Sequence, residues 1–141
     1  MKLGLVLATM FTAVVLLGAA ATDKATYVDH EKVAKGGALV TGTDFNIQIL
    51  KRTGPGMVEV HDKETDTFYV LEGQATFITG GTMIGGKVTA PNQQRGTDIK
   101  GGETHQLTKG DVIAIPAGIP HWFKDVSQQP FTYYVVKVIK P

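Results

Sequence analysis

The stretch Gly110–Asp125, GDVIAIPAGIPHWFKD, is the most informative part of this chain for its fold. An apolar run that reads as a β-strand ends at Pro116, and Gly118 and Pro120 follow before His121. Proline cannot donate a hydrogen bond to a neighbouring strand and glycine tolerates a positive φ, so the segment predicts a turn at a strand end. The backbone would then hold the His121 imidazole in a fixed position at the rim of a barrel.

A second stretch, Val58–Gly73 (VEVHDKETDTFYVLEG), supplies three more side chains that can ligate a metal. Glu59 and His61 are two residues apart, so in a strand they point to one face about 6.6 Å apart. Four polar residues then turn the chain back. This predicts Asp66 opposite His61 on a paired neighbouring strand, with Cβ atoms about 5 Å apart. We expect these three side chains to converge on one patch, with His121 as the fourth group.

The rest of the chain predicts further short strands. Phe45, Ile47 and Ile49 alternate with polar residues, as in a strand with one buried face. In the Gly- and Thr-rich part we expect a strand near Lys87–Thr89 and a loop through Pro91–Gln94. No segment after residue 35 has a useful helical period. About ten short strands separated by Gly and Pro turns predict an all-β sandwich or barrel.

Both stretches resemble sequence motifs of the cupin superfamily. The positions of Gly110, Pro116, Gly118 and His121 match the second cupin motif, and only its final Asn is replaced, by Asp125. This match is specific for the fold.

The first cupin motif is altered in this chain. Glu59 stands at the position of its first His, His61 at the second His, Asp66 at the Glu and Gly73 at the final Gly. The strand pattern extends the resemblance over nearly all of the chain after the N-terminal segment. The resemblance implies an all-β, double-stranded β-helix (jelly-roll) cupin barrel.

The resemblance also implies a metal site inside the barrel, formed by Glu59, His61, Asp66 and His121. Two nitrogens and two carboxylates suit an open octahedral site for manganese or iron better than a structural zinc cage. We expect a divalent transition metal, manganese, iron or zinc, with the identity left open. The alternative is a small, wet pocket without metal. An unliganded carboxylate, Glu59 or Asp66, is the candidate catalytic proton acceptor.

Further residues are candidates for the pocket wall, because period-two alternation places them on the inner face. Aromatic and aliphatic side chains of this kind more often belong to the core than contact a substrate, and a histidine here is more often exposed or already hydrogen-bonded. The candidates are Phe68, Val70, His105 and Phe123.

The function implied by the resemblance is a metal-dependent enzyme, of the dioxygenase, lyase or isomerase type, acting on a small organic molecule. The alternative is a non-catalytic cupin that binds a small ligand or a sugar. Fold analogy cannot select between them. The sequence shows no basic pair or polar cluster that identifies the substrate.

Residues 1–21 are predicted to be a signal peptide. Lys2 precedes an uncharged, mostly apolar run, Leu3–Leu17, and small residues follow at Gly18–Ala21. The run is shorter than the roughly 20 apolar residues that a membrane anchor needs. We therefore expect a cleaved signal, an N-terminal arm over residues 22–38, a cupin barrel over residues 39–141, and a secreted or periplasmic protein with no membrane attachment.

Composition excludes several classes of function. Removal of residues 1–21 leaves 13 basic and 13 acidic residues, so no net charge attracts nucleic acid or an anionic membrane. The absence of cysteine excludes thiolate chemistry and zinc–cysteine sites. Small cupins commonly dimerise through N-terminal strands, so the resemblance implies a homodimer.

Overall fold

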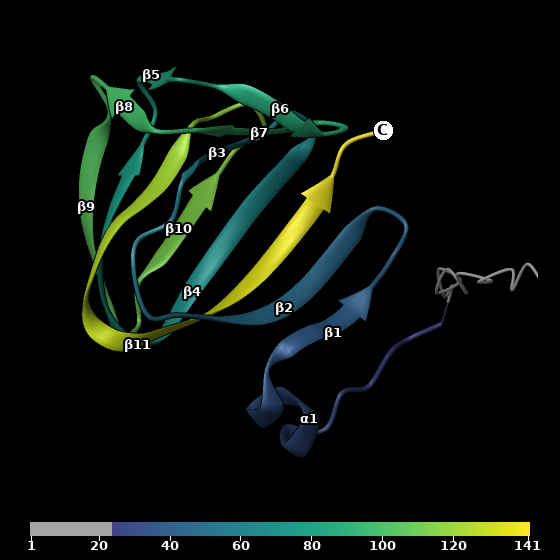
Figure 1. The fold of residues 1–141 in the computed structure, drawn as a ribbon. Coiled ribbons are helices and arrows are strands. Elements are labelled where there is room, and N and C mark those ends of the chain that lie inside the picture. The colour runs from purple at the N-terminus through teal and green to yellow at the C-terminus, as the bar shows by residue number, and fades with distance from the viewer. Residues whose placement is uncertain (1–23) are drawn as a thin grey trace, which may run out of the picture.

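Two long strands, β4 (Glu64–Thr79) and β11 (His121–Ile139), organise the computed structural model, which describes residues 24–141. They pair antiparallel along most of their length, and both bend so that their halves lie on different sides of the barrel (Figure 1). The pairing contains several register shifts between Phe123 and Tyr133. Because a β-bulge bends and twists a strand, these irregularities let one strand pair contribute to both walls.

Gly73 lies where β4 bends past β11. Its φ is +85°, and a Cβ atom there would lie 2.5 Å from the carbonyl oxygen of Pro130 and 2.6 Å from that of Gln128. The two backbones therefore approach too closely for any side chain. The glycine therefore bends β4 without ending it.

The remaining strands complete the two walls and a small separate sheet. β1 pairs with β2, β2 with the second half of β11, and β10 and β9 with different parts of β4. On the other side, β3 pairs with β11 and β7, and β7 pairs with β6, whereas β5 and β8 form a two-stranded sheet. Their bounds are β1 (Gly37–Thr41), β2 (Phe45–Arg52), β3 (Val58–His61), β5 (Thr82–Ile84), β6 (Lys87–Ala90), β7 (Gln93–Gly96), β8 (Asp98–Lys100), β9 (Glu103–Thr108) and β10 (Val112–Ile115). The predicted all-β jelly-roll barrel is confirmed.

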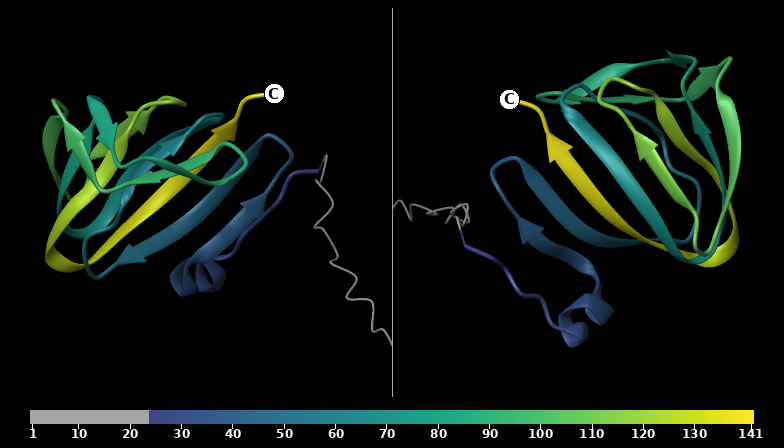
Figure 2. Two further views of the ribbon diagram at one scale, coloured as in Figure 1. Left: turned by 45° about the horizontal axis from the view of Figure 1, so that its top comes forward. Right: turned by 180° about the vertical axis from the view of Figure 1, so that it is seen from behind.

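The N-terminal arm contains the single helix of the described residues, α1 (His30–Lys35). Its N-cap is Asp29, whose side chain accepts a hydrogen bond of 2.8 Å from the backbone nitrogen of Lys32. The arm and α1 lie beside β1 at one edge of the sheet (Figure 2). The helix is too short to cross a membrane, and the predicted signal peptide, residues 1–21, lies outside the described residues.

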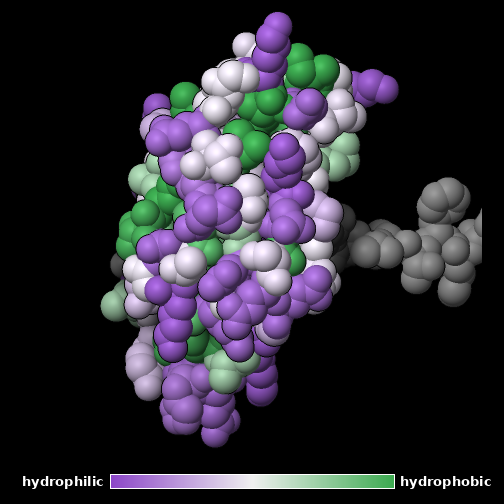
Figure 3. Space-filling view, turned by 90° about the vertical axis from the view of Figure 1, so that its left-hand side faces the viewer, coloured by the Kyte–Doolittle hydropathy of each residue, from purple (hydrophilic) through white to green (hydrophobic). Residues whose placement is uncertain are grey.

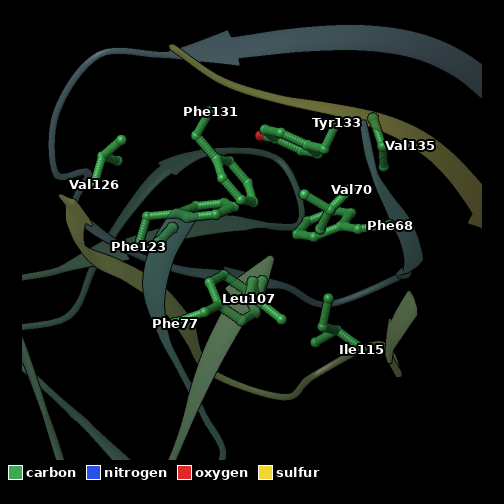
Figure 4. Close-up of a cluster of buried hydrophobic side chains, with 11 residues drawn as sticks. Phe68, Val70, Phe77, Leu107, Ile115, Phe123, Val126, Phe131, Tyr133 and Val135 are labelled. Atoms are coloured by element: carbon green, nitrogen blue, oxygen red, sulfur yellow. The ribbon is translucent and has the colours of Figure 1, made fainter. Parts of the chain in front are cut away.

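An aromatic core fills one half of the barrel interior (Figure 4). The Phe77 and Phe123 ring centroids are 4.5 Å apart, and those of Phe68 and Tyr133 are 4.8 Å apart. Outside, the face on the β9 side is mostly hydrophilic with scattered hydrophobic areas (Figure 3). The aromatic core includes Phe68, Val70, Ala75, Phe77, Leu107, Ile115, Phe123, Val126, Phe131, Tyr133 and Val135.

Candidate metal site

The two motif stretches meet in the structure. His121, at the start of β11, pairs with Glu59 on β3, and Ile115 on β10 pairs with Asp66 on β4. In the turn between β10 and β11, Gly118 has a φ of +85°, and its backbone N–H donates a 2.8 Å hydrogen bond to the carbonyl oxygen of His61. The predicted Pro-Gly turn therefore positions His121 and is attached directly to the other half of the site.

Three potential ligands converge at this junction. His61 Nε2 lies 3.4 Å from Glu59 Oε2, and His121 Nε2 lies 3.7 Å from the same oxygen. The two imidazole centroids are 5.1 Å apart, and both histidines are buried. Glu59, His61 and His121 each offer one ligand atom within 4.8 Å of the others. We refer to these three residues as the triad.

Hydrogen bonds to the other ring nitrogens orient both histidines. The Gln93 amide nitrogen donates to Glu64 Oε1 at 2.8 Å, so its amide oxygen is left to accept from His61 Nδ1. His121 Nδ1 lies 3.1 Å from the carbonyl oxygen of Ile119, which can only accept. With the proton on Nδ1, each histidine directs its Nε2 lone pair toward the space between the three triad residues, as metal-ligating histidines do toward their ion.

His61 Nε2 provides the test of fit for a metal. It is buried and has no hydrogen-bond partner among residues 24–141. A buried polar atom without a partner is destabilising, and a metal ion coordinated by Nε2 removes that deficit. Two imidazole nitrogens and one carboxylate also form the donor set of open, non-haem iron(II) sites. The triad therefore fits a divalent transition metal.

Glu59 has the electrostatic character of a ligand. Burial raises the pKa of its carboxyl, but the close contacts with the His121 and His61 side chains, together with the charge of Arg95, outweigh burial and hold the pKa well below its ordinary value. Glu59 is therefore ionised at neutral pH. Its Oε2 faces the two histidines, and its Oε1 faces Arg95 and Arg52.

Asp66 lies near the triad but has another partner. Its Oδ2 is 3.7 Å from His61 Nε2, and both its oxygens accept hydrogen bonds from Lys137 Nζ, at 2.6 and 2.8 Å. The expected pairing of its strand with that of His61 was wrong, because β3 and β4 share no ladder within residues 24–141. β3 pairs with β7 and β11 instead, so Asp66 approaches His61 across the interior.

The triad opens into a cavity of about 350 Å³. Phe68 and Phe123, two of the predicted pocket residues, line it. Val70 is fully buried in the aromatic core, and His105 lies elsewhere, with Nε2 2.8 Å from Thr79 Oγ1. The structure therefore brings together all four predicted ligands and two of the four predicted pocket residues.

Sequence reasoning missed the polar residues that complete the cavity wall. Lys137 follows Tyr133 and Val135 at a spacing of two, so alternation alone places it inward. Gln93 was expected in a loop, but it lies on β7 directly opposite His61. The missed lining residues include Asn46, Gln48, Arg52, Glu64, Gln93, Arg95 and Lys137.

Comparison with known proteins supports the fold described above. The family model described as Cupin matches residues 26–141. A search of curated proteins gave no match.

Among solved structures, the chain is similar to BH2720 from Bacillus halodurans, with a TM-score of 0.61, 15% identity, and 87% of this chain and 88% of that chain covered. It is also similar to the Cnp3 cupin domain from Schizosaccharomyces pombe, with a TM-score of 0.54, 13% identity and 74% of this chain covered, and it spans 60% of that chain. A third similar structure is TT1209 from Thermus thermophilus, with a TM-score of 0.51, 20% identity, and 75% of this chain and 83% of that chain covered. At these identities the similarity supports the fold.

Proposed function

This chain belongs to the cupin family, and we propose that it is a metal-dependent cupin enzyme that acts on a small organic molecule. One observation carries the proposal: His61 Nε2, His121 Nε2 and Glu59 Oε2 converge while both Nδ1 atoms are engaged elsewhere. This arrangement leaves three donors directed at one point in a cavity of about 350 Å³, at the small end of ligand sites.

The proposed ligands are Glu59, His61 and His121. Iron, manganese and zinc all suit imidazole and carboxylate donors. When bound, the ion would supply Lewis-acid polarisation of a substrate oxygen. Three protein ligands leave positions for substrate and water, as in catalytic sites.

Asp66 is the proposed proton acceptor, because Glu59 is used as a ligand. Lys137 donates to both Asp66 oxygens and lies 3.3 Å from Glu64 Oε2. Asp66 lines the cavity, with Oδ2 3.7 Å from His61 Nε2, so it is within reach of a substrate bound there. Lys137 would also hold the Asp66 carboxylate in place during the reaction.

Elemental analysis of the purified protein tests the proposal. We expect close to one equivalent of transition metal in the wild type, and loss of the ion in His61→Ala and in His121→Ala. His105→Ala is the matched control, because His105 lies outside the cavity, and it should keep the ion. An ion-free wild type after addition of zinc, manganese or iron(II) would exclude the proposal, as would unchanged ion content in both triad variants.

Turnover separates the enzyme from a binding module. Wild-type activity on small hydroxy or phenolic compounds should disappear in the two histidine variants and persist in His105→Ala. A wild type that holds metal and binds such compounds without converting them would instead support the non-catalytic alternative.

Export and dimer formation remain part of the proposal. If residues 1–21 are a signal peptide, the mature chain acquires its metal outside the cytoplasm, where affinity order favours zinc or copper over manganese. N-terminal sequencing of exported protein should begin near Thr22, and light scattering should give the mass of a dimer. A single full equivalent of manganese or iron in exported protein would contradict the expected zinc or mixed content.

A further inference from the structure

The chain contains two arginines among its 14 basic residues, and both lie at the same cavity. We propose that Arg52 and Arg95 form a carboxylate-binding pair beside the triad. The site would then take a small carboxylic acid that carries a second oxygen on the neighbouring carbon. This inference rests on the proposed metal site, because that second oxygen would reach the metal.

The two guanidinium groups flank one oxygen of Glu59. Arg95 Nη2 lies 3.6 Å and Arg52 Nη2 lies 3.9 Å from Glu59 Oε1. At these distances neither contact is a hydrogen bond. The side chains are 29% and 25% exposed, whereas His61 and His121 are almost fully buried. A molecule that enters from solvent therefore meets the arginines before the two histidines of the triad.

Arg52 is held in place from several sides. Its Cζ lies 4.4 Å from the centroid of the Phe123 ring, and its Nε donates a 3.4 Å hydrogen bond to the hydroxyl oxygen of Tyr133. A Cβ atom at Gly56 would lie 2.9 Å from Arg52 Nη1, so the glycine leaves room for the guanidinium. Within residues 24–141 the Arg52 side chain makes that single hydrogen bond. Its Nη groups are therefore positioned but still able to donate.

Arg95 is positioned by strand pairing. It lies on β7 opposite Glu59 on β3, and paired residues in a sheet share a face. Its Nη1 donates a 3.1 Å hydrogen bond to the carbonyl oxygen of Gln94, whereas its Nη2 points toward Glu59. The second arginine therefore approaches the same oxygen from β7, whereas Arg52 approaches it from β2.

The charge balance favours an anionic ligand. The cavity contains three cations, Arg52, Arg95 and Lys137, and three anions, Glu59, Glu64 and Asp66. Lys137 is engaged by Asp66 and Glu64. At the exposed side of the cavity, the positive charges of the two arginines are therefore opposed by the negative charge of Glu59 alone. A divalent ion in the triad makes this region strongly positive, and such a field attracts anions.

The chemistry of the wall favours a carboxylate. A guanidinium fork matches the two oxygens of a carboxylate. Because Glu59 directs Oε1 to the arginines and Oε2 to the histidines, a carboxylate held by the arginines would lie next to the metal position. A hydroxyl or keto oxygen on the adjacent carbon would then face the ion. Phe68 and Phe123 provide apolar wall for the carbon skeleton.

Calorimetric titration with glycolate and glycolamide tests this inference. Both molecules offer the α-hydroxyl, and only glycolate has the carboxylate. With zinc-loaded protein of measured ion content, we expect glycolate to bind about tenfold or more tightly than glycolamide. Arg52→Gln and Arg95→Gln should each remove that preference and keep the ion. Lys51→Gln, a loss of positive charge at an exposed neighbouring position, should keep the wild-type preference.

Several outcomes would overturn the inference and can be told apart from failure of the metal proposal. Equal affinity for the two probes in zinc-loaded wild type would overturn it, and so would a preference that survives in both arginine variants. Tighter binding of inorganic phosphate than of glycolate would identify a different oxyanion. If the wild type holds no ion, the metal proposal fails, but the same titration without zinc still tests the arginine pair. Loss of glycolate binding in Arg52→Gln would support the carboxylate-binding pair. Unchanged glycolate binding in that variant would reject it.

Discussion

The barrel interior has two halves that are built from the same strands and differ in character. In the aromatic half, Phe77 and Phe131 are fully buried among other rings (Figure 4). In the polar half, the Lys137–Asp66 pair and the triad line a cavity. Burial of a large apolar side chain contributes about 1.5–3 kcal/mol, whereas a buried ion pair is close to neutral for stability. The aromatic half therefore stabilises the fold, and the polar half is where the proposed metal and ligand would bind.

The boundary between the halves can be followed along β11. On β11 the inward side chains run Phe131, Tyr133, Val135 and then Lys137, and Lys137 pairs with Asp66 on β4. One strand face thus changes from apolar to charged within two residues. The packed aromatic half fixes the positions from which the polar side chains extend.

The largest effect should follow from a cavity in the aromatic half. Phe77→Ala should lower the free energy of unfolding by about 3–5 kcal/mol, because it removes a buried ring and leaves a void. Denaturant titration measures the change. Phe45→Ala, at a side chain that is 37% exposed, should have a clearly smaller effect. Equal losses for the two variants would mean that the aromatic half does not dominate stability.

In the polar half, the largest expected effect comes from breaking the buried ion pair. Lys137→Met should lower the free energy of unfolding by about 3 kcal/mol, because it leaves the Asp66 carboxylate buried without its partner. Adding Asp66→Asn to this variant should recover most of the lost free energy of unfolding. A double-mutant cycle measures the coupling, and a coupling below about 0.5 kcal/mol would contradict the assigned pairing.

The sequence predicted the fold and the histidine part of the site because local patterns encode both. The Pro-Gly turn before His121 and the period-two spacing of Glu59 and His61 depend on neighbouring residues alone. Arg52 and Arg95 are 43 positions apart in the numbering, on β2 and β7, and no local pattern indicates that they meet. The sequence showed no basic pair for this reason.

The polar cavity wall also explains why strand β7 was not expected from the sequence. Its sequence, QQRG, has no apolar alternation, and the segment was therefore expected to be partly a loop. Its inward side chains, Gln93 and Arg95, face a polar cavity and not the aromatic core. Hydrophobic periodicity identifies strands that bury apolar side chains, and it fails where the interior itself is polar.

A smaller effect is expected from the residue that orients His61. Gln93→Leu should reduce zinc affinity about 10- to 100-fold, because the hydrogen bond that fixes the His61 ring and tautomer is lost. Competition with a chromophoric chelator measures the affinity. Gln94→Leu is the matched control, since its side chain donates instead to Asp62 at the surface. Equal affinities for the two variants would remove Gln93 from the metal site.

The smallest effect concerns Tyr133, which lies at the boundary between the halves. Burial raises the pKa of its phenol, and the nearby Arg52 charge acts in the opposite direction without cancelling the rise. An unfolded tyrosine ionises near pH ~10. Above that pH the unfolded state releases a proton that the folded state retains, so ionisation favours unfolding. The stabilising contribution of Tyr133 is thus fully present below pH ~10 and declines as the pH rises further.

Urea unfolding of the wild type and Tyr133→Phe at pH 8 and near pH ~10.5 tests this sign. At pH 8 the variant should be less stable by about 1 kcal/mol, because the hydrogen bond between Arg52 and the hydroxyl is lost. At the higher pH that difference should shrink, because the phenylalanine variant has no phenol to ionise at this position. Tyr69→Phe, at a side chain that is 45% exposed, should show no such change with pH. A difference for Tyr133→Phe that stays constant with pH would mean that Tyr133 ionises as easily in the folded protein as in the unfolded chain, and that the boundary is open to water.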